Sequence, residues 1–114
     1  MSRRAGGEAE AKAAEFLESR GFVIIERNYA KPFGEIDIVA RDGDSVVFVE
    51  VKARAGSAFG GPEAAVDLRK RRKLARTAQA WLLSRRWEGP SRFDVVAFEG
   101  SEVRHITDAF GAAG

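Results

Sequence analysis

The sequence contains no cysteine, a single histidine and no long run of apolar residues. Without cysteine, neither a disulfide framework nor a thiolate metal site can form. The one histidine, His105, has no partner at metal-ligand spacing, so we expect no catalytic role for it. No apolar segment approaches the ~18 residues of a membrane-spanning helix, and the N-terminal segment has no signal-like apolar core. We therefore expect a cytoplasmic protein that does not contact a membrane.

What the sequence does contain is the composition of an ordinary globular protein. The 114 residues are 45% hydrophobic and 32% charged. This length suits a single domain that buries its own core. We expect the domain to span 1–114, with its core at about 6–106 and a frayed tail at 107–114.

Positive charge is concentrated in one short segment. The net charge is only +2, yet six lysines and arginines lie between positions 69 and 76. Such clustering favours a polyanionic partner. On this feature alone, a solvated helix face explains the cluster equally well.

Residue patterning predicts an α/β fold, with a central mixed sheet of about five strands flanked by two main helices. The helices are expected at about 7–20, ending at Gly21, and from 63 or 67 to 85. The strands are expected at 22–28, 35–41, 46–52, 92–100 and 102–106. The loops are expected at 29–34, at a hairpin signal 42–45 and at a small-residue segment 53–62. The resulting order is αβββαββ.

Two acids and a lysine stand inside the most apolar of these strands. Asp37 lies in 35–41, whereas Glu50 and Lys52 end the strand 46–52. Because that strand is apolar on both faces, it is predicted to be central, and its acid is then costly to bury without a partner. A hairpin loop at 43–44 would set Asp37 directly opposite Glu50. A loop at 42–43 would instead make Glu50 a diagonal neighbour on the same face.

Carboxylates in this arrangement repel each other and raise each other's pKa unless a cation lies between them. Oxygen ligands suit Mg²⁺ or Mn²⁺, and Lys52 on the same face is placed to orient or activate a water or to neutralise developing charge. The alternative is a cross-strand network of ion pairs, in which Lys52 meets Glu35 and Arg41 lies near Asp37.

These residues resemble the motif of the PD-(D/E)xK nuclease superfamily, with Asp37 first and Glu50-Val51-Lys52 second. Ile36 stands where the family name has proline. The closer resemblance is to the YraN-like family of small, uncharacterised bacterial proteins, and it covers roughly 6–98. Its pieces appear here in order as "GEA" at 7–9, "RN" at 27–28, "GEID" at 34–37, "FVEVKAR" at 48–54, "KRRK" at 70–73 and "RFDVV" at 92–96.

The resemblance implies a restriction-endonuclease-like core and a metal-dependent DNA endonuclease that hydrolyses phosphodiester bonds. It implies Asp37, Glu50 and the carbonyl of Val51 as ligands of Mg²⁺ or Mn²⁺, with Lys52 positioning the attacking water. Archaeal Holliday junction resolvases carry a further glutamate on the first helix, and Glu8 matches it. Glu8 is equally well explained as a favourable acid in a first helical turn. No small-molecule organic cofactor is implied.

The expected partner is duplex or branched DNA, and a homodimer is plausible because the chain is short. Basic side chains would contact the phosphate backbone in a salt-dependent way, namely Lys70, Arg71, Arg72, Lys73 and Arg54. Two alternatives stay open: a non-catalytic nucleic-acid-binding module that retains the fold, or a scaffold for a protein partner. For Asp94, we favour a structural reading, as a buried acid bonded to Arg92 or to a backbone amide.

Overall fold

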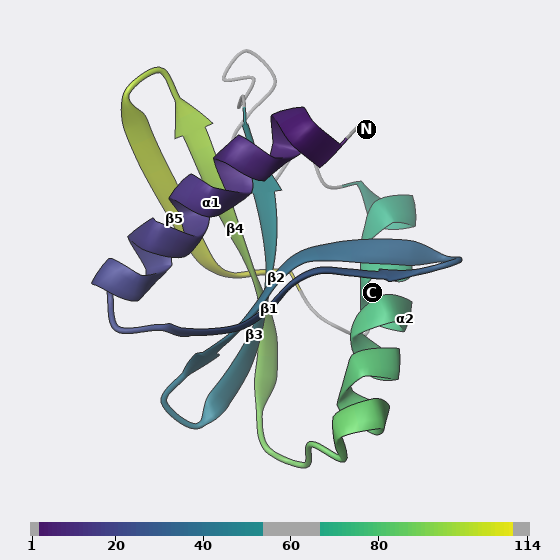
Figure 1. The fold of residues 1–114 in the computed structure, drawn as a ribbon. Coiled ribbons are helices and arrows are strands. Elements are labelled where there is room, and N and C mark those ends of the chain that lie inside the picture. Colours follow the sequence, from purple (N-terminus) through teal and green to yellow (C-terminus); the bar gives the residue numbers. More distant parts are fainter. Residues whose placement is uncertain (1–2, 54–66, 111–114) are drawn as a thin grey trace.

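The computed structural model describes residues 3–53 and 67–110, with side chains from residue 7. Two helices and five strands follow one another as αβββαββ, so the expected fold class and element order are confirmed (Figure 1). The elements are α1 (Arg3–Ser19), β1 (Val23–Lys31), β2 (Gly34–Asp42), β3 (Ser45–Lys52), α2 (Leu68–Arg85), β4 (Ser91–Glu99) and β5 (Glu102–Phe110). Neither described helix is long and apolar enough to cross a membrane.

The five strands form one sheet in the order β1-β2-β3-β4-β5, which makes β3 the central strand as predicted. Among the described strands, only β3 and β4 pair in parallel, and α2 lies in the connection between them. The two helices cover opposite faces, because β3 side chains alternate between the apolar cluster of α1 and that of α2. Both faces of β3 are therefore buried, which explains its continuous apolar run.

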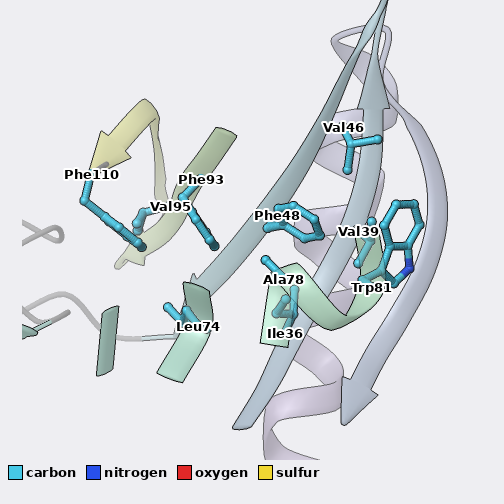
Figure 2. Packing of buried hydrophobic residues seen from close by; sticks show 10 residues of the cluster. All are labelled: Ile36, Val39, Val46, Phe48, Leu74, Ala78, Trp81, Phe93, Val95 and Phe110. Carbon is cyan, nitrogen blue, oxygen red and sulfur yellow. The ribbon is translucent and has the colours of Figure 1, made fainter. Parts of the chain in front are cut away.

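The larger apolar cluster lies between α2 and the sheet (Figure 2). Leu74, Ala78 and Trp81 form the buried face of α2. The Phe48 ring lies edge-on to Trp81, with 5.8 Å between their centroids, and 5.5 Å from Phe93. Each large apolar side chain buried in this way contributes about 1.5–3 kcal/mol. This cluster fixes α2 against the sheet, and with it the basic residues at its start.

The end of the first helix expected at Gly21 and a start of the second at 67 are confirmed, whereas α1 begins at Arg3, before the expected start at about 7. Gly21, with φ +93°, follows the end of α1, and its N–H donates to the carbonyl of Glu18 over 3.0 Å. Asp67 caps α2, because its side chain accepts a hydrogen bond of 2.9 Å from the N–H of Lys70. The cap sets where α2 begins and therefore where Lys70 stands.

Two expectations about loops were wrong. Residues 29–31 continue β1 and Gly34 begins β2, so the expected loop 29–34 shrinks to a turn at 32–33. Residues 107–110 of the expected frayed tail belong to β5, where Phe110 is buried and stacks on Phe93 with 4.9 Å between centroids. In both cases pairing with a neighbouring strand supplies order that the local sequence does not signal. The remaining tail, 111–114, and most of the loop 53–62 lie outside the described residues.

The pairing of β2 with β3 matches the hairpin loop at 43–44. Partners run from Asp42 with Ser45 to Ile38 with Val49, and Gly43 has φ +61°. Beyond Ile38 the backbone pairing stops, and the β1–β2 hairpin crosses over α2 while β3 continues beside β4 (Figure 1). We call this divergence, between Asp37 on β2 and Glu50 on β3, the fork.

Candidate active site

Asp37 lies half-buried at the fork and turns its carboxylate toward β3. Its Oδ2 atom accepts a hydrogen bond of 2.8 Å from the N–H of Val51. Burial raises the pKa of Asp37 to about 8, helped by the negative charges of Glu50 and Glu10 and only partly opposed by the Val51 amide. In the metal-free molecule Asp37 is therefore mostly protonated at neutral pH.

Glu50, beside Asp37, is buried and held by two lysines. Its Oε2 atom lies 2.5 Å from Nζ of Lys70 and 3.6 Å from Nζ of Lys52. Lys52 thus lies beside the acids, as expected. The structure pairs Lys70, at the start of α2, with Glu50, near the end of β3. Its expected contact with a phosphate stays a prediction.

The pKa values of the two lysines shift in opposite directions. Burial lowers the pKa of Lys52, and the adjacent Lys70 lowers it further, against the opposing pull of Glu50. Burial also acts to lower the pKa of Lys70, but the hydrogen bond and charge of Glu50 outweigh it, so the net shift is upward. Lys70 is therefore the fixed cation of the site, and Lys52 is the lysine that releases its proton more readily.

The alternative of a purely cross-strand ion-pair network is not what the structure contains around Asp37. Arg41 does not pair with Asp37; its guanidinium donates to the carbonyl of Gly43 at 3.1 and 3.2 Å and lies over the Trp87 ring. The charges of Glu50 and Glu10 near Asp37 are of the same sign as its own carboxylate. The acid pair is thus not neutralised from the β2 side.

The acid that α1 brings to the fork is Glu10 rather than the predicted Glu8. Glu8 is exposed and lines a separate cavity of about 230 Å³. Glu10 is 7% exposed, and its buried Oε1 atom has no hydrogen-bond partner, with Nη2 of Arg27 3.9 Å away. Helical periodicity is the reason, because Glu10 shares with Leu17 the face that packs on the sheet. Residues on that face recur every three to four positions, and this spacing is visible in the sequence.

The donor set at the fork consists of oxygen atoms. Within the described residues, no group of three or more histidines, cysteines and acids is arranged to hold a metal. Mg²⁺ and Mn²⁺ need fewer protein ligands, since Mg²⁺ keeps several waters and uses one or two carboxylates. Asp37 and Glu50 meet that requirement, and the orphaned oxygen of Glu10 adds an acceptor nearby. The residues fit such an ion, and the carbonyl of Val51 stays a prediction as a further ligand.

The remaining predicted nucleic-acid contacts lie along α2. Arg72 and Lys73 are exposed, whereas Arg71 is half-buried and lies over the Phe110 ring at 5.1 Å. Arg54 lies outside the described residues. Arg72 and Lys73 line a cavity of about 660 Å³, together with Arg76 and residues 30–35 of the β1–β2 turn. We call this cavity the hairpin groove; the sequence gives no signal that the turn and α2 lie side by side.

Asp94 is the second buried acid of the sheet, and its structural reading is confirmed. It accepts hydrogen bonds from Arg92 at 2.9 and 3.2 Å and from the N–H of Asp108 at 2.9 Å, and lies 2.8 Å from Nε2 of His105. Burial acts to raise the pKa of Asp94, but the hydrogen bonds from His105 and Arg92 outweigh it and lower the pKa. Asp94 thereby ties β4 to β5, and His105 is occupied in this network.

Comparison with known proteins gives one consistent result. The family described as "Uncharacterised protein family UPF0102" matches residues 9–98. A UPF0102 protein of Halorhodospira halophila is 47% identical over 95% of this chain and 88% of its own length. Others from Moorella thermoacetica and Persephonella marina are 52% and 42% identical, over 85% and 92% of this chain and 82% and 91% of their own.

Proposed function

This chain belongs to the uncharacterised protein family UPF0102, and we propose that it is a metal-dependent nuclease that hydrolyses phosphodiester bonds in DNA. Membership confirms the resemblance to the YraN-like family. The family description names no activity. The proposal therefore rests on the chemistry of the fork.

The observation that carries the proposal is that two acids, Asp37 and Glu50, lie close to each other at the fork. Burial and the like charge of Glu50 raise the pKa of Asp37 to about 8, which costs the metal-free protein stability. A carboxylate with a purely structural role is usually satisfied, as Asp94 is by four donors. An acid left strained beside a second acid in a half-buried site is typical of a functional site, and here a cation would relieve it.

The residues of the fork have distinct roles in the proposed reaction. A bound Mg²⁺ or Mn²⁺ would supply Lewis-acid stabilisation of the phosphate and a water of lowered pKa. Asp37, Glu50 and the Val51 carbonyl would hold it. Lys52 would donate to the attacking water and offset the charge that develops on the phosphate. Lys70 orients Glu50 through their ion pair.

The exposed cations one turn further along α2 support DNA as the substrate. Arg72 and Lys73 lie two and three residues after Lys70 on α2, so a backbone whose scissile phosphate lies at the fork would pass them. Branched DNA, action as a homodimer and a cytoplasmic location are parts of the same proposal. A homodimer would bring two sites to one branched substrate.

The decisive experiment is a cleavage assay on labelled duplex, single strand, flap, four-way junction and RNA, each with Mg²⁺, Mn²⁺ or chelator. Wild-type protein is compared with Lys52→Ala and with Arg104→Gln, which removes an exposed cation on the edge strand β5. Metal-dependent cutting by wild type and the control, reduced at least about 100-fold in Lys52→Ala, is the expected result. Cutting that persists in Lys52→Ala or in chelator would overturn the proposal.

A second candidate is a nucleic-acid-binding module without turnover. It is favoured by one observation, that Lys70 already neutralises Glu50 in the metal-free molecule. Salt-sensitive binding of the same substrates without cutting would point to this module. Neither binding nor cutting would point to a scaffold for a protein partner.

A further inference from the structure

The hairpin groove is built by a close approach between the β1–β2 turn and α2. A Cβ atom on Gly34 would lie 2.5 Å from Oγ1 of Thr77 and 3.2 Å from the carbonyl oxygen of Lys73. Only glycine fits such a contact without displacing its neighbours. Thr77 is fully buried and donates its hydroxyl to the same carbonyl of Lys73 over 2.8 Å. The turn is thereby set firmly against α2, and the groove is a fixed feature of the fold.

The groove gathers positive charge that nothing described neutralises. Its lining includes four cationic side chains and one carboxylate, that of Glu35. Within the described residues, none of the four cations takes part in an ion pair. The cations are Lys31, Arg72, Lys73 and Arg76. Because like charges held together repel one another, this arrangement favours an anionic ligand with several charges.

Phe33 gives the groove an aromatic wall. Its half-buried ring belongs to neither of the two apolar clusters that form the core. The guanidinium carbon of Arg76 lies 4.2 Å from the ring centroid. An aromatic face beside an arginine plane is a surface on which nucleic-acid bases stack, whatever their sequence. A simple phosphate-binding pocket would not need this ring.

The groove and the fork both take residues from the first half of α2, a few positions apart along the helix. Lys70 contacts Glu50, the backbone of Lys73 lies against Gly34, and Arg76 covers Phe33. Six helical residues advance about 9 Å, which is the length of about two or three stacked nucleotides at roughly 3.4 Å each. A chain of phosphates that starts at the fork thus reaches Phe33 within a few nucleotides.

We propose that the hairpin groove binds a single-stranded nucleic-acid segment directly beside the scissile phosphate, with a base stacked on Phe33. The inference rests on the proposed nuclease function and names the substrate class of that site. A cavity of about 660 Å³ has the size of a small-molecule pocket, which suits a few nucleotides of one strand. A duplex presents its bases stacked and paired, so its bases are not free to reach Phe33. The preferred substrates therefore carry a single-stranded arm or gap.

The test measures binding separately from cutting. Labelled twelve-nucleotide oligothymidine and a twelve-base-pair duplex are titrated in chelator, and anisotropy is read at several salt concentrations. The variants are Arg76→Gln, Lys73→Gln and Phe33→Leu, with Arg104→Gln as the control for loss of one exposed cation. Melting curves establish that each variant is folded, and Arg76→Gln, an exposed position, keeps the test valid if Phe33→Leu is unstable.

Wild-type protein should bind the single strand more tightly than the duplex. Phe33→Leu should weaken single-strand binding about fivefold or more with little change in salt dependence, because stacking is lost. Arg76→Gln and Lys73→Gln should weaken it and reduce the salt slope by about 0.7 each, since each releases one phosphate contact. Arg104→Gln should bind like wild type. In Mg²⁺, Arg76→Gln should slow flap cutting more than duplex cutting.

Several results would overturn this assignment. If wild type cuts or binds DNA while the three groove variants match Arg104→Gln, the groove proposal fails and the nuclease proposal stands. If polyglutamate of equal charge competes as well as oligothymidine, the groove recognises charge alone and not a strand. If wild type neither binds nor cuts any nucleic acid, both proposals fail together.

Discussion

The same sheet holds two aspartates, Asp94 fully buried and Asp37 half-buried, and their surroundings shift their pKa values in opposite directions. Asp94 receives donors from β4 and β5, and these hydrogen bonds lower its pKa despite complete burial. Asp37 receives one hydrogen bond from the part of the chain that the structure describes, and burial with two neighbouring carboxylates raises its pKa to about 8. Burial acts to raise the pKa of both carboxylates, so the opposite net shifts come from the groups that surround them.

Asp94 stabilises the fold, whereas the carboxylate of Asp37 destabilises the metal-free protein. Arg92 joins Asp94 to Asp42 and so links β4 to β2 across β3, the strand that lies between them. At the fork, the lysines approach Glu50 and leave Asp37 beside like charges. Strain kept at one place in an otherwise satisfied sheet is usual where a site has a function.

Removal of Asp94 should have the largest effect on stability. Asp94→Ala leaves Nε2 of His105 and the N–H of Asp108 without their acceptor and leaves Arg92 with Asp42 alone, and we expect a loss of about 3–5 kcal/mol in the free energy of unfolding. Urea denaturation of the metal-free protein measures this. Asp44→Ala, at an exposed hairpin position, is the control and should change stability by less than about 0.5 kcal/mol. A loss below about 1 kcal/mol in Asp94→Ala would mean that the network is not structural.

Lowering the pH should remove most of the stability difference between wild type and Asp94→Ala. The pKa of Asp94 is lower in the folded than in the unfolded state, whose value is about 3.9. Its stabilisation is therefore complete well above pH 4 and is lost as the pH falls through the depressed folded value. The gap between wild type and Asp94→Ala should be constant from about pH 8 to 5 and shrink below about 4. A gap that widens on acidification would contradict the assigned pKa direction.

At the fork, removal of the aspartate charge should raise the free energy of unfolding instead of lowering it. Asp37→Asn removes a carboxylate that burial and its neighbours destabilise, so we expect the metal-free protein to gain about 1–2 kcal/mol. The measurement is urea denaturation in chelator at pH 7.5.

Divalent metal should stabilise wild type but not the Asp37 variants. Mg²⁺ or Mn²⁺ should raise the Tm of wild type, because a ligand that binds the folded state stabilises it, and should not raise that of Asp37→Asn or Asp37→Ala. An equal metal-induced gain in wild type and both variants would place the metal elsewhere.

The sequence predicted those contacts that depend only on strand geometry. Gly43 indicated the hairpin loop, and the loop set the register that brings Asp37 beside Glu50. The apolar alternation of β3 indicated a central strand, and the proximity of Arg92 to Asp94 along β4 indicated their bond. Each of these follows from a period of two residues and a turn type, both of which are local.

What the sequence did not predict depends on how helices lie on the sheet. The ion pair of Lys70 with Glu50 and the contact of Gly34 with α2 are set by the rotation of α2, which the core residues of Figure 2 fix. The strand residues 29–31 and 107–110 are ordered by their neighbours in the sheet. Such tertiary contacts override local preference and leave no local pattern.

The smallest expected effect distinguishes the two glutamates of α1. Glu10→Gln removes a charge that acts on Asp37 from a buried position, and we expect it to weaken Mg²⁺ binding by up to about tenfold, as for other residues that tune metal ligands. Glu8→Gln changes an exposed residue on the same helix and should leave the affinity unchanged. Calorimetric titration of both variants with Mg²⁺ measures this. If Glu8→Gln were the weaker binder instead, the acid that α1 contributes would be the one matched by resemblance, and the orphaned oxygen of Glu10 would belong to its pairing with Arg27 alone.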